Sequence, residues 1–228
     1  MGSRRLPNGT GAPTHVTKVV VTWLTMLSLS HFVYATALVV PSYGDKYSKF
    51  VKQLEAGDTN VDYKAFRESF LESEQFKTAG KQQSELGTLR KQMHGLMKKS
   101  NYSEIIDAAN KILSIDYTDM EAHKIVRQTY KALGDTANEK KHHDIEFGLL
   151  NSIVKNGDGK TCQTAWPVIQ ITEEYFILQM IGAKLLRQSL DNTGGLCDKM
   201  EVQTNEGNRT CYFEVSKVFK GYNKEGIQ

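Results

Sequence analysis

The sequence predicts an α+β fold in which helical hairpins pack against a small, mostly antiparallel C-terminal sheet. Three observations lead to this prediction. Residues 46–154 are rich in helix-forming residues and contain no proline. The stretch "NGDG" at 156–159 then marks a helix stop and a sharp turn. Beyond this turn, the apolar residues recur with a period close to two, which is typical of strands.

The N-terminal segment predicts export. Residues 1–37 contain three basic side chains and no acidic one, and an uncharged apolar run begins at Val19. The small residues of Ala35-Thr36-Ala37 fit a secretory signal that is cleaved after Ala37. The alternative is an uncleaved signal anchor ending at about residue 40, because the apolar run could just cross a bilayer. Both interpretations predict a secreted, periplasmic or cell-surface protein, since basic flanks stay inside, and only the anchor attaches it to a membrane.

The charge balance argues against a nucleic-acid-binding protein. The chain has 29 basic and 26 acidic residues, and three of the basic ones lie within residues 1–37. The chain that remains after cleavage is therefore neutral. Binding to phosphate backbones needs a basic surface, so no nucleic-acid partner is predicted.

Three cysteines in the C-terminal third of the chain predict a disulfide, and two sequons, at Asn101 and Asn208, predict glycans. An oxidising compartment favours one disulfide between two of Cys162, Cys197 and Cys211, and spacing alone does not choose the pair. Sequons at Asn101 and Asn208 fall at predicted turns, where a glycan could be tolerated.

The helical half predicts amphipathic helices with apolar faces directed to the core. The stretches "VDYKAFRESFLESEQF" and "ELGTLRKQMHGLMKK" each place apolar residues on one helical face. The following stretch, "NYSEIIDAANKILSIDYTDMEAHKIVRQTYKALGDTANE", resembles two tetratricopeptide repeat units, which begin near Leu89 and His123. Two units are fewer than a freestanding array needs, so they must pack on another part of the chain.

Five polar side chains occupy positions of the second unit where the first unit has mostly apolar ones: His123, Arg127, Glu139, His143 and Glu146. Helical spacing could bring all five together between two antiparallel helices, while His142 lies on another face. Buried charges must be paired, neutralised or metal-bound. Two interpretations stay open: a partly solvated set of ion pairs, or a functional polar or metal site with a divalent cation. No other cofactor is predicted.

The C-terminal half predicts strands around one short helix. The stretch "WPVIQI" is a candidate strand, "TEEYFILQMIG" a helix with Thr172 as its N-cap, and "KLLRQSL" another strand. The stretch "DKMEVQTNEGNRTCYFEVSKV" predicts a hairpin that turns at "NEGN".

The stretch "KNGDGKT" is a poor match to a phosphate-binding loop. That loop needs a glycine where this chain has Val154, and it needs a strand before it and a helix after it. The order of predicted elements here is the reverse. We therefore interpret Gly157 and Gly159 as parts of a turn, and we expect Lys160 to have no role in nucleotide binding.

Several further stretches resemble a family of exported proteins described only as domain of unknown function 4919. They run from "VDYKAFRESFLES" through "EAH" and "GLLNSI" to "NGDGKTCQTAWPVIQITEEYFIL", and then to "DKMEV" and "CYFEV". The resemblance covers nearly all of the chain after the signal. It implies export and an α+β fold, and it implies no particular activity.

These observations divide the chain into a signal at 1–37, a helical region at 38–155 and a β-rich region at 156–228. We expect the last two regions to share one core, because each alone would bury too little apolar surface. The predicted function is a non-enzymatic module that binds a protein or peptide partner. The alternative is a hydrolase or metal-binding protein that uses the five polar residues. No catalytic residue is assigned, because no serine, histidine and acid motif and no known metal signature occurs.

Overall fold

The computed structural model describes residues 38–40 and 42–225. The predicted signal or anchor, with its cleavage after Ala37, lies outside these residues. Within the described part of the chain, no helix combines the length and apolar character needed to span a bilayer.

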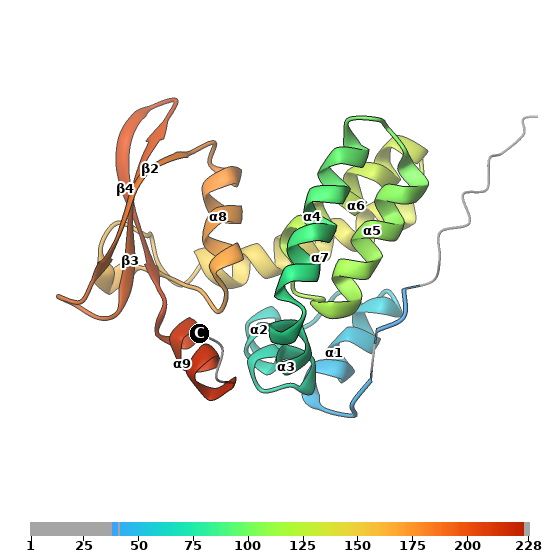
Figure 1. The fold of residues 1–228 in the computed structure, drawn as a ribbon, viewed down its shortest axis with the longest axis horizontal. Helices are drawn as coiled ribbons and strands as arrows, with labels where there is room; N and C mark the ends of the chain where they lie inside the picture. Colours follow the sequence, from blue (N-terminus) through green and yellow to red (C-terminus); the bar gives the residue numbers. More distant parts are fainter. Residues whose placement is uncertain (1–37, 41, 226–228) are drawn as a thin grey trace, which may run out of the picture. The chain divides into compact units, whose positions relative to one another are not determined.

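The first half of the described chain is helical (Figure 1). Its helices are α1 (Lys46–Glu55), α2 (Tyr63–Leu71), α3 (Glu74–Lys81), α4 (Gln83–Met97), α5 (Tyr102–Ile115), α6 (Met120–Leu133) and α7 (Thr136–Val154). Helix α4 packs on α5, α5 on α6, and α6 on α7, while α2 also contacts α7. This half therefore consists of successive helical hairpins, as the sequence predicts.

Aspartates set the beginnings of several helices. The carboxylates of Asp45, Asp62, Asp119 and Asp135 each accept a hydrogen bond from the backbone N–H three residues later, at 2.7–3.0 Å. A side-chain acceptor at this position satisfies a backbone donor that the first helical turn leaves unpaired. The C-cap of α6 is Gly134, whose φ of 75° is left-handed.

The helix boundaries in this region agree with the repeat register predicted from the sequence. Helix α5 begins at Tyr102, and Asp116 follows its last residue. The turn after α6 is formed by Gly134 and Asp135. The resemblance to tetratricopeptide repeats nevertheless remains a prediction, since helix boundaries alone do not define a repeat family.

The second half forms a small mixed sheet with helices beside it. It contains a short 3-10 turn (Cys162–Thr164), β1 (Trp166–Pro167), α8 (Ile171–Met180), β2 (Lys184–Asp191), β3 (Cys197–Thr204), β4 (Gly207–Glu214) and α9 (Ser216–Glu225). The strand order is β1-β4-β3-β2. Strand β1 runs parallel to β4, and the other two pairings are antiparallel. The predicted α+β fold, with its mostly antiparallel sheet, is confirmed.

One predicted strand is shorter than expected. Strand β1 covers only Trp166 and Pro167 of the stretch "WPVIQI", although the backbone N–H of Val168 also donates to the carbonyl of Glu214 in β4. Ile171 already lies in α8. The N-cap of α8 is Gln170 rather than Thr172. The backbone N–H of Ile169 donates to the carboxylate of Glu173 at 2.8 Å. The buried carboxylate of Glu173 thus accepts a hydrogen bond from the segment that joins β1 to α8.

The apolar core includes side chains from both halves of the described chain. One contiguous cluster contains Phe66 and Met93 from the helical half together with Met200 and Phe213 from the sheet. That the helical and β-rich regions unfold as one unit remains a prediction. A disulfide joins Cys162 to Cys197, with their Cα atoms 5.8 Å apart, so one disulfide forms, as predicted, and the structure identifies its partners. The third cysteine, Cys211, is free and buried.

Candidate functional site

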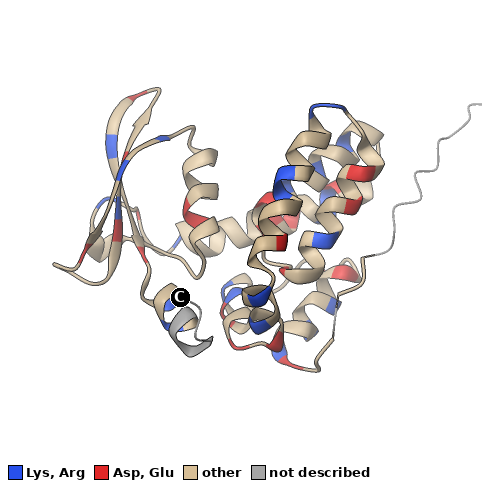
Figure 2. Ribbon diagram, viewed as in Figure 1, with Lys and Arg blue, Asp and Glu red and all other residues tan. Residues whose placement is uncertain are grey.

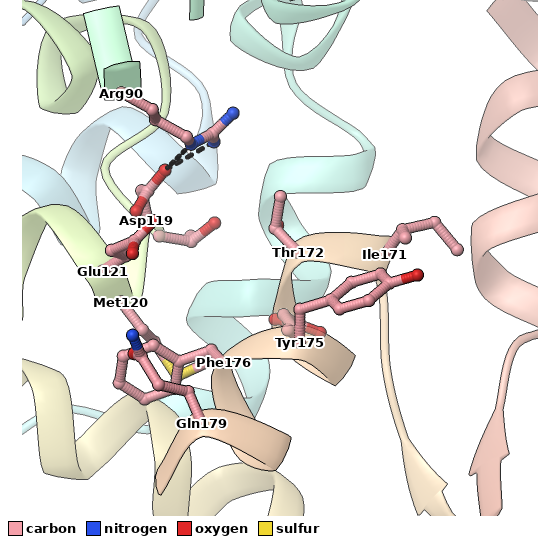
Figure 3. A pocket seen from close by; sticks show the side chains of 11 residues that line it. Arg90, Asp119, Met120, Glu121, Ile171, Thr172, Tyr175, Phe176 and Gln179 are labelled. Atoms are coloured by element: carbon pink, nitrogen blue, oxygen red, sulfur yellow. Dashed lines mark hydrogen bonds and ion pairs between the residues drawn. The ribbon is translucent and has the colours of Figure 1, made fainter. Parts of the chain in front are cut away.

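A pocket of about 420 Å³ lies between α4, α6 and α8 (Figure 3). Arg90 reaches it from α4, Glu121 from α6, and Gln179 from α8. Most of its exposed lining is apolar. We call it the helix pocket, and its lining residues are Arg90, Thr118, Asp119, Met120, Glu121, Ile171, Thr172, Glu173, Tyr175, Phe176 and Gln179.

Hydrogen bonds and ion pairs hold the polar side chains of the helix pocket in place. The guanidinium of Arg90 contacts one carboxylate oxygen of Asp119, with its Nη2 at 2.6 Å and its Nε at 3.2 Å (Figure 3). The other oxygen of Asp119 caps α6. His94 of α4 has its Nε2 3.1 Å from a carboxylate oxygen of Glu121. Both acidic residues at the start of α6 therefore have a basic partner from α4.

A buried ion pair fixes α8 beside α2 behind the helix pocket. Arg67 and Glu173 are both buried, and two nitrogens of the guanidinium contact the two carboxylate oxygens at 2.7 and 2.6 Å. Arg67 also donates to Ser152 Oγ and to the carbonyl of Pro167, each at 3.2 Å. A bidentate contact of this kind is directional, so it sets the position of α8 relative to the helical half.

The buried carboxyl group of Asp116 forms a second link. Its oxygens accept hydrogen bonds from the backbone N–H and hydroxyl of Thr118 and from the side-chain amide of Gln170. Burial, with a further contribution from Asp119, raises the pKa of Asp116 to about 6. Since Gln170 precedes α8, this network connects the turn before α6 to the start of α8.

Glu174 directs its carboxyl group away from solvent, and neither of its oxygens has a hydrogen-bond partner among the described residues. Burial is the largest cause that raises the pKa of Glu174 to about 9, and the charges of Asp198 and Glu173 add to it. This carboxyl group is therefore protonated at neutral pH. Sequence reasoning missed it, because adjacent glutamates in a first helical turn are typical of an exposed helix start.

The structure does not bring the five predicted polar residues together. Arg127 Nε contacts Glu146 at 2.6 Å, and Glu146 is fully buried. Glu139 is half-buried in the first turn of α7. His143 is exposed, with its ring 4.6 Å from that of Phe147. Arg127 and Glu146 thus form an ion pair, and His143 is exposed whereas His123 is buried.

The buried partner of His123 is His142. Their Nδ1 atoms lie 2.9 Å apart, and Nε2 of His123 lies 3.0 Å from the backbone carbonyl of Tyr117. Because a carbonyl can only accept, His123 carries its proton on Nε2, and His142 donates from Nδ1. Burial lowers the pKa of His123 to about 4 and that of His142 to about 2, so both rings are neutral at physiological pH.

The other predicted site residues occupy separate places. Asn101 is the half-buried N-cap of α5, and Asn208 is exposed near the start of β4. Glycosylation at these positions remains a prediction. Within residues 38–40 and 42–225, no group of three or more histidine, cysteine or acidic side chains is placed to hold a metal ion. The metal site also remains a prediction, for which metal analysis of the purified protein is the direct test.

Comparison with known proteins identifies one related family. A family model described as "Domain of unknown function (DUF4919)" matches residues 42–224. The matched range includes the helix pocket, the disulfide and the whole sheet. No curated protein and no solved structure matches the chain.

Proposed function

We propose that this chain, which belongs to the DUF4919 family, is a non-enzymatic module that binds a peptide segment of a protein partner in the helix pocket. The observation that carries the proposal is the pocket itself. It combines buried apolar side chains with polar groups whose positions are fixed by hydrogen bonds and ion pairs. That combination is typical of sites that anchor one side chain of a ligand and orient the rest.

The lining of the helix pocket suits a peptide in particular. Met120 and Phe176 are buried and offer an apolar anchor site. Thr172 and Gln179 are exposed on α8 and offer a hydroxyl and an amide to the backbone of an extended segment. Arg90 is already paired with Asp119, which leaves little unbalanced charge for a strongly charged small molecule.

The arrangement of helices also supports a peptide ligand. Helices α4 and α6 are the first helices of the two hairpins that resemble tetratricopeptide units, and repeat arrays of this kind bind partners on a surface formed by successive repeats. Here α8 from the second half of the chain contacts α6 and forms the opposite wall. The second half would thus narrow an open repeat surface into a pocket.

A peptide-display selection on the purified protein tests this proposal. The affinity of the selected peptides is then compared for wild type, Thr172→Arg and the matched control Thr136→Arg. Thr172 is exposed at the helix pocket, whereas Thr136 is exposed at the start of α7. We expect Thr172→Arg to weaken binding by about tenfold or more, or 1.4 kcal/mol, and Thr136→Arg to leave it unchanged. Equal affinities for the two variants would argue against the pocket.

We also propose that the protein acts outside the cytosol. The disulfide between Cys162 and Cys197 supports this location, because such bonds persist mainly in oxidising compartments. Comparing the mass of the exported protein with that of the full chain would show whether cleavage follows Ala37. The same sample, analysed for zinc, manganese and calcium, tests the alternative of a metal-binding protein.

A further inference from the structure

Strand β2 lies at an edge of the sheet. The strand order is β1-β4-β3-β2, and β3 is its one partner among the described strands. The backbone groups on its other side pair with no described strand. An edge of this kind is a template on which a further strand can pair.

Apolar side chains gather at this edge. Leu186 and Leu190 of β2 are 51% and 49% exposed, and Tyr175 of α8 is 46% exposed. The hydroxyl of Tyr175 donates to the side chain of Gln188 on β2 at 3.1 Å, so this tyrosine lies beside the strand. These are three of the eight large apolar side chains that the described residues leave exposed. Isolated exposed apolar residues are common, but several together indicate an interaction surface.

The pairing of β2 with β3 determines which residues of β2 share a face. Leu185, Gln188 and Leu190 lie opposite Val202, Met200 and Asp198, on the face whose β3 residues are buried. The other face of β2 carries Lys184, Arg187, Ser189 and Asp191. An irregularity between Leu185 and Arg187 inserts Leu186 as an extra residue, as in a β-bulge.

This pattern is complementary to itself. If a second β2 lies antiparallel about a two-fold axis at Gln188, each Lys184 faces Asp191 of the other copy. The apolar pair Leu185 and Leu186 then faces Leu190, and each pair of partners shares one face of the sheet. Such pairs of opposite charges and of apolar side chains stabilise neighbouring antiparallel strands.

We propose that two copies of this chain associate through the outer edges of β2, so that one sheet continues across the two-fold axis. The contact involves one strand of eight residues and a few side chains from each copy. It is smaller than a standard interface of about 1,600 Å². We therefore expect a reversible dimer with a dissociation constant between about 1 μM and about 1 mM.

A charge-reversal series tests the pairing. Sedimentation equilibrium is measured on protein recovered after expression of the full chain, for wild type, Lys184→Asp and the double variant Lys184→Asp/Asp191→Lys. The single change places two acidic residues opposite each other at both ends of the contact. We expect it to raise the dissociation constant by about tenfold or more, and we expect the double variant to restore association. Failure to restore it in a folded double variant overturns the proposed register.

A second pair of variants tests the apolar part without using Asp191, which also accepts hydrogen bonds from Thr193. Leu190→Asp should abolish association. Its control is Leu133→Asp, at an exposed leucine on α6, which should leave association unchanged. A wild-type protein that stays monomeric at about 1 mM overturns the proposal, even if another segment of the same chain covers the edge. A dimer whose dissociation constant is unchanged by Leu190→Asp also overturns the proposal.

Discussion

Two neighbouring histidines show how one position along a helix decides the role of a side chain. His142 is buried against His123, whereas His143 is 52% exposed on the side-chain scale. Helical spacing correctly placed these two residues on different faces. It could not decide which face is inward, because α7 has only a weakly amphipathic sequence, in which polar residues such as His142 and Glu146 occupy buried positions.

We predict that His142→Phe lowers the free energy of unfolding by about 1–3 kcal/mol at pH 7, because it leaves the buried Nδ1 of His123 without its hydrogen-bond donor. The adjacent substitution His143→Phe is the matched control, and it should change the stability by less than about 0.5 kcal/mol. Urea unfolding of the two variants and the wild type measures both values. A larger effect at His143 would contradict the structure.

The buried carboxyl group of Glu174 predicts a stability that depends on pH. Its pKa is about 9 in the folded chain, against an ordinary value of 4.5. Between these values the folded protein holds one more proton than the unfolded protein, so this group lowers the free energy of unfolding as pH rises. The slope is at most about 1.4 kcal/mol per pH unit. Below pH 4.5 the contribution of Glu174 to the free energy of unfolding is fully present. This contribution decreases as pH rises and is lost near pH 9.

Glu174→Gln removes this titration and keeps the shape of the side chain. We predict that the stability of the variant relative to the wild type increases steadily from pH 5 to pH 8, as measured by urea unfolding. The histidines contribute equally to the free energy of unfolding of both proteins, so the difference between the two proteins at each pH does not include them. The control is Glu206→Gln, at an exposed residue in the turn between β3 and β4. The difference in free energy of unfolding between this variant and the wild type should stay constant from pH 5 to pH 8. A constant difference for Glu174→Gln would show that this carboxyl group is ionised in the fold.

Among the elements, helices were predicted more accurately than the short strand β1. A capping aspartate and a C-terminal glycine are local signals that mark the two ends of α6, whereas the ends of α5 follow from the repeat register. Just after β1, the backbone N–H of Ile169 donates to Glu173, whose buried partner Arg67 lies 106 residues away. No local pattern carries such information.

The turn after α7 gives a prediction about backbone conformation. Gly159 has a φ of 66°, and an added Cβ would also contact the ring of Trp166. At Gly157, a Cβ would overlap the backbone carbonyl of Thr164. We predict that replacing either glycine with valine lowers the free energy of unfolding by about 1 kcal/mol or more. Chemical denaturation would measure this loss.

Lys160→Ala is the control for the same turn. The lysine side chain is 78% exposed, and its ammonium lies 3.4 Å from the carboxylate of Asp158. An exposed pair of this kind contributes little, so the variant should be as stable as the wild type. A nucleotide that raises the melting temperature of the wild type but not of Lys160→Ala would restore the phosphate-loop interpretation.

For the whole molecule, the sequence predicted the fold class and the presence of a disulfide but did not locate the helix pocket. The apolar stripes and the change of period identify the helical and β-rich halves. The pocket arises where α8 meets α4 and α6, and that meeting depends on contacts between distant residues. Both charge signs are spread over the described helices in the view of Figure 2.

We predict that the two halves unfold as one cooperative unit, in which Arg67 and Glu173 hold α8 in place. Removing one partner of a buried ion pair leaves the other charge uncompensated and typically costs about 3–5 kcal/mol. We therefore predict that Glu173→Gln destabilises the whole described chain, including the helical half, although Glu173 belongs to the second half. Its control is Glu206→Gln, which should be neutral.

Differential scanning calorimetry of the wild type and of Glu173→Gln measures this cooperativity. We expect a single transition for each protein, with a ratio of calorimetric to van't Hoff enthalpy near one and a lower melting temperature for Glu173→Gln. Two separate transitions in the wild type would contradict it. So would a Glu173→Gln protein in which only the second half melts earlier while the helical half keeps its melting temperature.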